Sequence, residues 1–183
     1  QGEYGDPVAF GGQMWYPDTK SKAYYCFFNK NKLSRKVSGK GNLSTLKLVK
    51  YAGYLAPNDP RVGLLTTRPP AYIRLIHNSS GTEVLLFTWH APLSGAGGGV
   101  FNPAAHSFFG TIADQMAHGK VAVIAGDMNA TSKQVAKSYS NVWEAAGSGL
   151  DHIMTNQTFS NAAYYDDVKS DVHYLFLADI SWN

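Results

Sequence analysis

Cysteine is almost absent from the sequence, and the one cysteine, Cys26, cannot form a disulfide within the chain. It lies between Tyr24-Tyr25 and Phe27-Phe28, which indicates a buried strand residue rather than a nucleophile. No apolar run approaches the roughly 20 residues that span a bilayer. No basic segment followed by an apolar one precedes the first motif. These absences exclude an internal disulfide scaffold and predict a chain without a transmembrane segment.

The chain of 183 residues has an apolar content of 44%, which predicts one domain with a substantial core. No repeat, low-complexity tract or long linker divides it, so we expect a single domain over residues 1–183. The sequence begins with Gln1 rather than Met, and we therefore expect an N-terminally truncated or processed form.

Acidic residues are missing from residues 20–50, where nine Lys or Arg occur. The basic residues of this segment are Lys20, Lys22, Lys30, Lys32, Arg35, Lys36, Lys40, Lys47 and Lys50. Such a segment predicts an electropositive lobe, whose natural partner is a polyanion such as nucleic acid or an anionic membrane surface. The alternative interpretation is a solvated, flexible loop over residues 29–44, which are rich in Lys, Ser, Asn and Gly.

Most of the predicted elements are strands. Apolar or alternating patterns predict strands at 22–28, 45–51, 121–125, 151–155 and 173–180, and a hairpin of 71–76 and 83–89 around the turn-forming residues 78–81. A helix is predicted between Asn102, which can cap it, and His118-Gly119, which ends it. Apolar residues recur at helical spacing between these limits. The order strand, helix, strand indicates a layered α/β domain.

The segment 121–130 is the most informative part of the sequence. Five small or branched apolar residues suit a strand covered on both faces. Gly126 then permits a sharp turn where a side chain would clash. Asp127 and Asn129, two positions apart, can project from the same side of the loop that follows. Their oxygen and amide groups suit a hydrated divalent cation together with a phosphate or an attacking water.

Acidic and imidazole side chains also lie at the ends of other predicted strands. His90 lies where the second strand of the hairpin ends, Asp151 begins a strand, and Asp171 and His173 precede or begin the last one. Each of these residues alone is more often a cap or a packing residue than a catalytic group. Their order along the chain, with the Gly-Asp-x-Asn segment in the middle, is much less expected by chance.

With this order of motifs the sequence resembles the endonuclease/exonuclease/phosphatase superfamily, which has the deoxyribonuclease I-like fold. Within it, the sequence most resembles the catalytic B subunit of cytolethal distending toxins. The motifs that carry the resemblance are Arg68-Pro69, Ile73-Arg74, His90-Ala91, Gly126-Asp127-Met128-Asn129, Leu150-Asp151 and Ser170-Asp171. They cover roughly two thirds of the chain. The resemblance implies an α/β/β/α sandwich of two packed mixed β-sheets flanked by helices, here without the first strand.

The resemblance also implies metal-dependent cleavage of phosphodiesters. The two implied catalytic imidazoles are His90 and His173. Asp127 and Asn129 would orient the water and the phosphate, and the Asp151 carboxylate would orient His173. The implied cofactor is Mg²⁺ or another divalent cation such as Mn²⁺ or Ca²⁺. Asp171 would lie beside the metal.

Three further residues are candidates for contacts with phosphate. Arg68 and Arg74 could bind it in a bidentate manner from strand ends, and Asn102 follows a glycine-rich loop that a phosphate could approach. A surface arginine on a hairpin is an equally good interpretation of Arg68 and Arg74. A flexible loop is the simpler interpretation of residues 95–99.

The sequence departs from the family pattern in two places. Val172 separates Asp171 from His173, whereas the family has the acid and the imidazole adjacent. In a regular strand this spacing puts both side chains on one face, so His173 is misplaced unless a bulge restores the geometry. The family's metal-binding glutamate has one counterpart here, Glu3, for which the alternative is a frayed terminal residue.

The leading functional prediction is a DNA endonuclease that acts as a secreted or delivered toxin or effector, with a delivery subunit or an inhibitor protein as a further partner. The basic segment favours a long polyanionic substrate. The alternatives are a phosphoinositide phosphatase or sphingomyelinase-type phosphodiesterase, which uses the same site chemistry, and an inactive binding domain of the same fold. The spacing around Val172 supports the inactive alternative.

Overall fold

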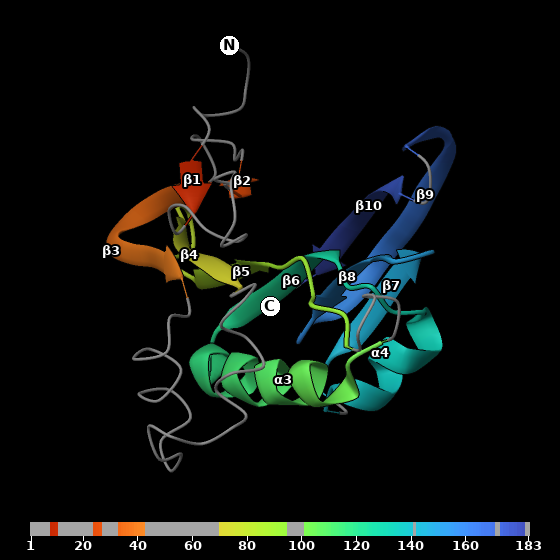
Figure 1. Cartoon of the computed structure of the whole chain (residues 1–183). Coiled ribbons are helices and arrows are strands. Elements are labelled where there is room, and N and C mark those ends of the chain that lie inside the picture. Colours follow the sequence, from red (N-terminus) through yellow and green to blue (C-terminus); the bar gives the residue numbers. More distant parts are fainter. Residues whose placement is uncertain are drawn as a thin grey trace.

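The computed structural model of the chain describes residues 8–10, 24–26, 33–42, 70–94, 101–140, 142–170 and 173–181. A six-stranded mixed sheet with the order β3-β4-β5-β6-β8-β7 lies at its centre (Figure 1). In that order, the strands are β3 (Leu33–Asn42), β4 (Ala71–His77), β5 (Glu83–Thr88), β6 (Val121–Asp127), β8 (Asp151–Thr155) and β7 (Glu144–Ser148). The neighbours β5 and β6 are parallel, and the other pairs of this sheet are antiparallel.

Two further sheets are antiparallel pairs. One consists of β1 (Val8–Phe10) and β2 (Tyr24–Cys26), and the other consists of β9 (Thr158–Ser170) and β10 (His173–Ser181). The β9–β10 hairpin follows β8 in the chain and contacts β7 and β8 of the large sheet (Figure 1). The first residue of β10 is therefore close to the edge at which β8 begins.

Two helices are described, α3 (Pro103–Ala117) and α4 (Ser132–Ser138). The chain passes through α3 between β5 and β6, and such a crossover is what two parallel neighbouring strands require. The Asn102 side chain accepts a hydrogen bond from the amide of Ala105 at 3.1 Å, and Pro103 occupies the first turn. The predicted helix and its cap are confirmed.

The core lies between the large sheet and α3. The buried residues of β5, β6 and α3 are Leu85 and Phe87, Ala122 and Ile124, and Phe109, Ile112, Ala113 and Met116, with several others. The rings of Phe87 and Phe109 meet edge to face with centroids 5.6 Å apart. These contacts pack α3 tightly against the central strands β5 and β6.

The fold class predicted from the sequence is confirmed, because the mixed sheet, the second sheet and the helices agree with an α/β/β/α sandwich. Within the described ranges the second sheet is an antiparallel hairpin rather than a mixed sheet. The predicted strands at 71–76, 83–89, 121–125, 151–155 and 173–180 all exist within a residue or two. None of the described helices is long and apolar enough to cross a membrane. The single-domain boundary stays a prediction.

The sequence patterns missed several elements. The helix α4 and the strand β7 have few apolar residues, and those of β9 do not alternate regularly, so these elements depend on pairing and capping partners. The loop interpretation of residues 29–44 is wrong over Leu33–Asn42, because this segment pairs with β4 at the edge of the sheet. Lysines are common on such edge strands. The predicted strand at 45–51 lies outside the described residues.

Candidate active site

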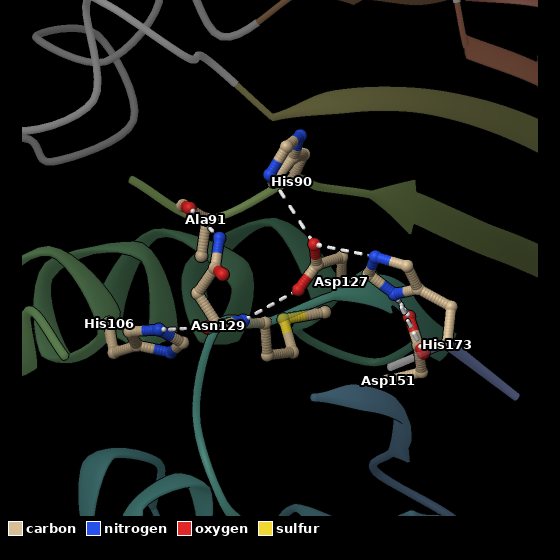
Figure 2. A network of polar contacts seen from close by, with 8 residues as sticks. His90, Ala91, His106, Asp127, Asn129, Asp151 and His173 are labelled. Carbon is tan, nitrogen blue, oxygen red and sulfur yellow. Dashed lines mark hydrogen bonds and ion pairs between the residues drawn. The ribbon is translucent and has the colours of Figure 1, made fainter. Parts of the chain in front are cut away.

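The first part of the candidate site lies where the parallel strands β5 and β6 end. Backbone pairing continues past the end of β5, since Trp89 N donates to Ala125 O at 3.2 Å and Ala91 N donates to Asp127 O at 2.8 Å. Parallel neighbours present their carboxyl ends at one edge of a sheet. The His90 Nε2 atom therefore lies 3.4 Å from Asp127 Oδ2 (Figure 2).

Gly126 makes this close approach possible. Its φ angle is 149°, and a Cβ atom at this position would lie 2.1 Å from the carbonyl oxygen of Trp89. No side chain fits at that distance, so the main chain of Trp89 can pack directly against residue 126 only because it is glycine. The predicted clash at Gly126 is confirmed, whereas the predicted turn is not, because Gly126 lies within β6 and pairs with His152 of β8.

The second part of the site comes from β8 and β10. Asp151 pairs directly with Asp127 in the register of the antiparallel strands β6 and β8. The Nδ1 atom of His173, the first residue of β10, lies 3.0 Å and 3.2 Å from the two carboxylate oxygens of Asp151. Its Nε2 atom lies 3.9 Å from Asp127 Oδ2 (Figure 2). The Asp127 carboxylate is thus between two imidazoles, one of which is held by a second carboxylate.

The extra residue before His173 does not keep the imidazole away from the site. His173 pairs with Ser170 at the start of the β9–β10 hairpin, and the first shift in the register of this hairpin follows between Tyr174 and Leu175. The imidazole of His173 reaches Asp151, which was in doubt from the sequence. Asp171 lies outside the described residues.

Asn129 joins the two strand ends. Its Nδ2 atom donates to Ala91 O at 2.7 Å, and its backbone amide donates to Asp127 Oδ1 at 2.9 Å. Asp127 therefore uses one oxygen to hold the turn and directs the other toward His90 and His173. The structure brings together the five residues His90, Asp127, Asn129, Asp151 and His173, called here the strand-end cluster.

Besides Asp171, four other predicted residues are not placed in this cluster. The Nε atom of Arg74 lies 3.6 Å from Glu83 Oε1, at the start of β5 and away from the end that carries His90. Asn102 caps α3 with its side chain. The structure therefore supplies other partners for both residues. Arg68 and Glu3 lie outside the described residues, and their phosphate and metal roles stay predictions.

Sequence reasoning missed two histidines below the cluster. His106 of α3 and His152 of β8 are 0% and 2% exposed. Burial lowers the pKa of His106 to about 4, and burial also lowers the pKa of His152 below its usual value. Both imidazoles are therefore neutral near pH 7. The available signal was the helical spacing, which places His106 beside Ala105 and Phe109 on the core face of α3.

The donors of the cluster fit a divalent cation. One ligand atom from each of Asp127, Asp151 and His173 lies within 4.8 Å of the other two. Two carboxylates and the nearby carboxamide of Asn129 are hard oxygen donors, which suit Mg²⁺, Mn²⁺ or Ca²⁺. An imidazole is compatible with Mn²⁺ in such a set.

Comparisons with known proteins give matches to structures only. The sequence matches no protein-family model and no curated protein sequence. An endonuclease/exonuclease/phosphatase from Bacteroides vulgatus matches with a TM-score of 0.63 and 15% identity over 99% of the chain. A mannosyl-6-phosphatase from Bacteroides thetaiotaomicron matches with a TM-score of 0.58 and 16% identity over 97% of the chain. TDP2 from D. rerio in complex with a single-strand DNA product matches with a TM-score of 0.55 and 11% identity over 92% of the chain.

The chain is shorter than these proteins. It spans 77%, 72% and 72% of the three matched chains, and 63% of another, the human Nocturnin catalytic domain. At these identities the likeness concerns the course of the backbone. The chain has the deoxyribonuclease I-like fold of endonuclease/exonuclease/phosphatase structures, the fold that the order of its motifs predicted.

Proposed function

We propose that the chain is a divalent-metal-dependent phosphodiester hydrolase and that the strand-end cluster is its active site. The observation that carries the proposal is the position of the Asp127 carboxylate between the imidazoles of His90 and His173, with His173 bound to Asp151. An imidazole paired with a carboxylate beside a second acid is a typical arrangement for proton transfer to or from water.

His173 is the proposed general base. Its Nδ1 atom faces the Asp151 carboxylate, which only accepts hydrogen bonds, so this contact keeps the proton on Nδ1. The Nε2 atom is then the basic nitrogen, and it faces the side of the cluster where Asp127 lies. A water held there can lose a proton to Nε2 as it attacks phosphorus.

His90 and Asn129 are the proposed phosphate-binding groups. His90, whose side chain is 33% exposed, can donate from Nε2 to a phosphate oxygen or to the leaving oxygen. The Nδ2 atom of Asn129 is bound to Ala91 O, which fixes the plane of the carboxamide. Its carbonyl oxygen and second amide hydrogen then have defined directions toward a ligand.

Asp127 would hold the metal, and the family resemblance adds Glu3 and Asp171 as further ligands, while Asp151 holds His173. The ion would neutralise phosphate charge and stabilise charge that develops in the transition state. The side chains around it position the water, the phosphate and the proton acceptor.

We further propose nucleic acid, and DNA first, as the substrate. The basic residues of 20–50 favour a long polyanion over a small phosphomonoester. The similarity to TDP2, whose structure contains a single-strand DNA product, supports the same choice. Action as a secreted or delivered toxin, with a delivery subunit or inhibitor, rests on the resemblance of the sequence to the B subunit of cytolethal distending toxins and stays a prediction.

The second candidate is a phosphatase. It is favoured by the similarity to the mannosyl-6-phosphatase, which has the same fold at a slightly higher TM-score than TDP2. Phosphoinositides would combine a phosphomonoester with an anionic surface that the basic segment could contact.

The experiment is incubation of the protein with supercoiled plasmid and Mg²⁺, with and without chelator, beside an assay of phosphate release from phosphoinositides and from mannose 6-phosphate. We expect metal-dependent nicking that is lost in His173→Ala and retained in His118→Ala, which changes an exposed histidine at the end of α3. Phosphate release with an intact plasmid would favour the second candidate. Inertness toward all three substrates with Mg²⁺, Mn²⁺ and Ca²⁺ would contradict both.

A further inference from the structure

Asn129 has an unusual backbone. Among the residues that the structure describes, it is the only non-glycine residue with a positive φ angle, 46°. This left-handed conformation is unfavourable for residues with a Cβ atom, and it persists where surrounding contacts determine it. The contacts that hold the Asn129 turn therefore decide where its carboxamide points.

On the side of the strand-end cluster, Asn129 itself makes two of these contacts. Its amide donates to Asp127 Oδ1 and its Nδ2 atom donates to Ala91 O. The turn is also tied to the residue that precedes β8, because Met128 N donates to Leu150 O at 2.8 Å. These bonds hold the turn on the side of the strand-end cluster. The carbonyl groups of Met128 and Ala130, before and after Asn129, have other partners.

On the side of the core, the two missed histidines bind those carbonyl groups. His106 Nε2 lies 2.9 Å from Met128 O, and His152 Nε2 lies 2.7 Å from Ala130 O. A carbonyl oxygen only accepts, so both Nε2 atoms must carry a proton. The imidazoles thus donate to the residue immediately before Asn129 and to the residue immediately after it. We call His106 and His152 the imidazole clamp.

The tautomer of His106 is fixed from its other nitrogen. The Tyr139 hydroxyl lies 3.3 Å from His106 Nδ1 and donates to it, because the proton of the neutral ring is on Nε2. The ring also packs on Trp89 and Phe101, with centroids 5.0 Å away in each case. His106 therefore has one position and one tautomer available in the core.

The clamp links the core to the cluster. His106 is carried by α3 (Figure 2), and His152 is carried by β8, next to Asp151, so two separate elements hold one turn of three residues. Neither imidazole is among the side chains that the cluster offers to a ligand, since His106 and His152 are 0% and 2% exposed. Their contribution to any reaction must pass through Asn129 and its neighbours.

We propose that His106 and His152 are positioning residues that hold Asn129 in its left-handed conformation and thereby orient its carboxamide toward the phosphate. The effect on turnover rests on the proposed function. The effect on the conformation of the turn does not, so the two can be tested separately.

The test compares His106→Met, which removes the donor, with His106→Gln, whose Nε2 can donate to the same carbonyl. Ile112→Ala is the control, because Ile112 is buried on the same helix but its side chain cannot form a hydrogen bond with the turn. Amide hydrogen exchange is measured at Asn129 and at Ile124 of β6, and kcat and KM are measured with plasmid and Mg²⁺. We expect exchange at Asn129, relative to Ile124, to rise at least about tenfold in His106→Met, and kcat to fall by a similar factor.

His106→Gln should restore most of both quantities, whereas Ile112→Ala should change exchange uniformly and leave kcat unchanged at a temperature where it is folded. If His106→Met does not fold, Tyr139→Phe takes its place, because it removes one hydroxyl and should raise exchange at Asn129 by a smaller factor. Unchanged relative exchange at Asn129, or failure of His106→Gln to restore it, would overturn the clamp. A wild type inert toward phosphodiesters would contradict the proposed function, and the exchange experiment would still decide the clamp.

Discussion

Two pairs of histidines occupy opposite sides of the Asn129 turn, and their surroundings differ completely. The side chains of His90 and His173 are 33% and 46% exposed and face carboxylates. His106 and His152 are buried and face backbone carbonyl groups. The first pair can gain or lose a proton toward a ligand, whereas the second pair is held neutral by the core. The same side chain therefore serves chemistry in one place and rigidity in the other.

The largest expected effect concerns the exposed pair. His173→Ala and Asp151→Asn should each reduce kcat about a thousandfold, because one removes the proton acceptor and the other removes the group that orients it. The double variant should be no slower than His173→Ala alone, since Asp151 acts through His173. Asp167→Asn, at an exposed site of β9, is the matched control. Effects that multiply in the double variant would show that the two residues act independently.

In stability, unlike in turnover, the buried pair of histidines should have the larger effect. His106→Ala should lower the free energy of unfolding by about 3 kcal/mol, because it leaves a cavity and a buried carbonyl without its donor. His90→Ala should change it by less than about 1 kcal/mol, since a half-exposed side chain contributes little to the core. Denaturant unfolding at neutral pH measures both. Equal losses would remove the proposed distinction between the pairs.

The third prediction follows from the pKa of His106, which burial lowers from 6.5 in the unfolded chain to about 4 in the folded protein. Between pH 4 and pH 6.5 the unfolded chain binds a proton on His106 that the folded protein does not bind. The contribution of neutral His106 to the free energy of unfolding is therefore complete above pH 6.5 and is lost as the pH falls through 4. A shift of this size corresponds to about 3 kcal/mol at most.

The check is denaturant unfolding of the wild type and of His106→Gln at pH 7.5 and pH 4.5. The free energy of unfolding should differ less between pH 7.5 and pH 4.5 in His106→Gln than in the wild type, because the variant has no group that titrates at this position. His118→Gln, at an exposed site, should retain the wild-type difference. An unaltered pH dependence in His106→Gln would show that another group is responsible.

The smallest expected effect is at Asn129, where the two regions meet. Asn129→Gly and Asn129→Ala both remove the carboxamide, but only glycine accepts a φ angle of 46° without strain. We expect the glycine variant to be the more stable of the two by about 1 kcal/mol, as measured by thermal unfolding. A more stable alanine variant would mean that the turn relaxes when the side chain is absent.

The sequence indicated that polar groups lie at strand ends, whereas the resemblance to the endonuclease/exonuclease/phosphatase superfamily supplied their roles and the pairing of Asp151 with His173. His90 and Asp127 each follow a strand with a strong apolar pattern, and Asp151 begins another, so the ends of neighbouring strands carry the chemistry. Gly126 was recognised as a position where a side chain would clash, and a Cβ atom there would indeed lie 2.1 Å from Trp89 O.

The imidazole clamp could not be predicted in the same way. Helical spacing indicates only that His106 lies on the core face of α3, and no pattern distinguishes His152, because the partners of both are backbone oxygens of a distant turn. The position of His173 was uncertain for a related reason. The direction of the His173 side chain depends on how β10 begins its pairing with β9, a strand that the sequence pattern did not reveal.

The most direct test of the account is the rate of plasmid cleavage with Mg²⁺ by the wild type, His90→Ala, His173→Ala and His118→Ala under identical conditions. The account predicts that the wild type and His118→Ala cleave at equal rates, that chelation stops both, and that the two cluster variants are at least about a hundredfold slower while remaining folded. Metal-dependent cleavage that persists in both His90→Ala and His173→Ala would contradict it, because the reaction would then occur elsewhere in the protein.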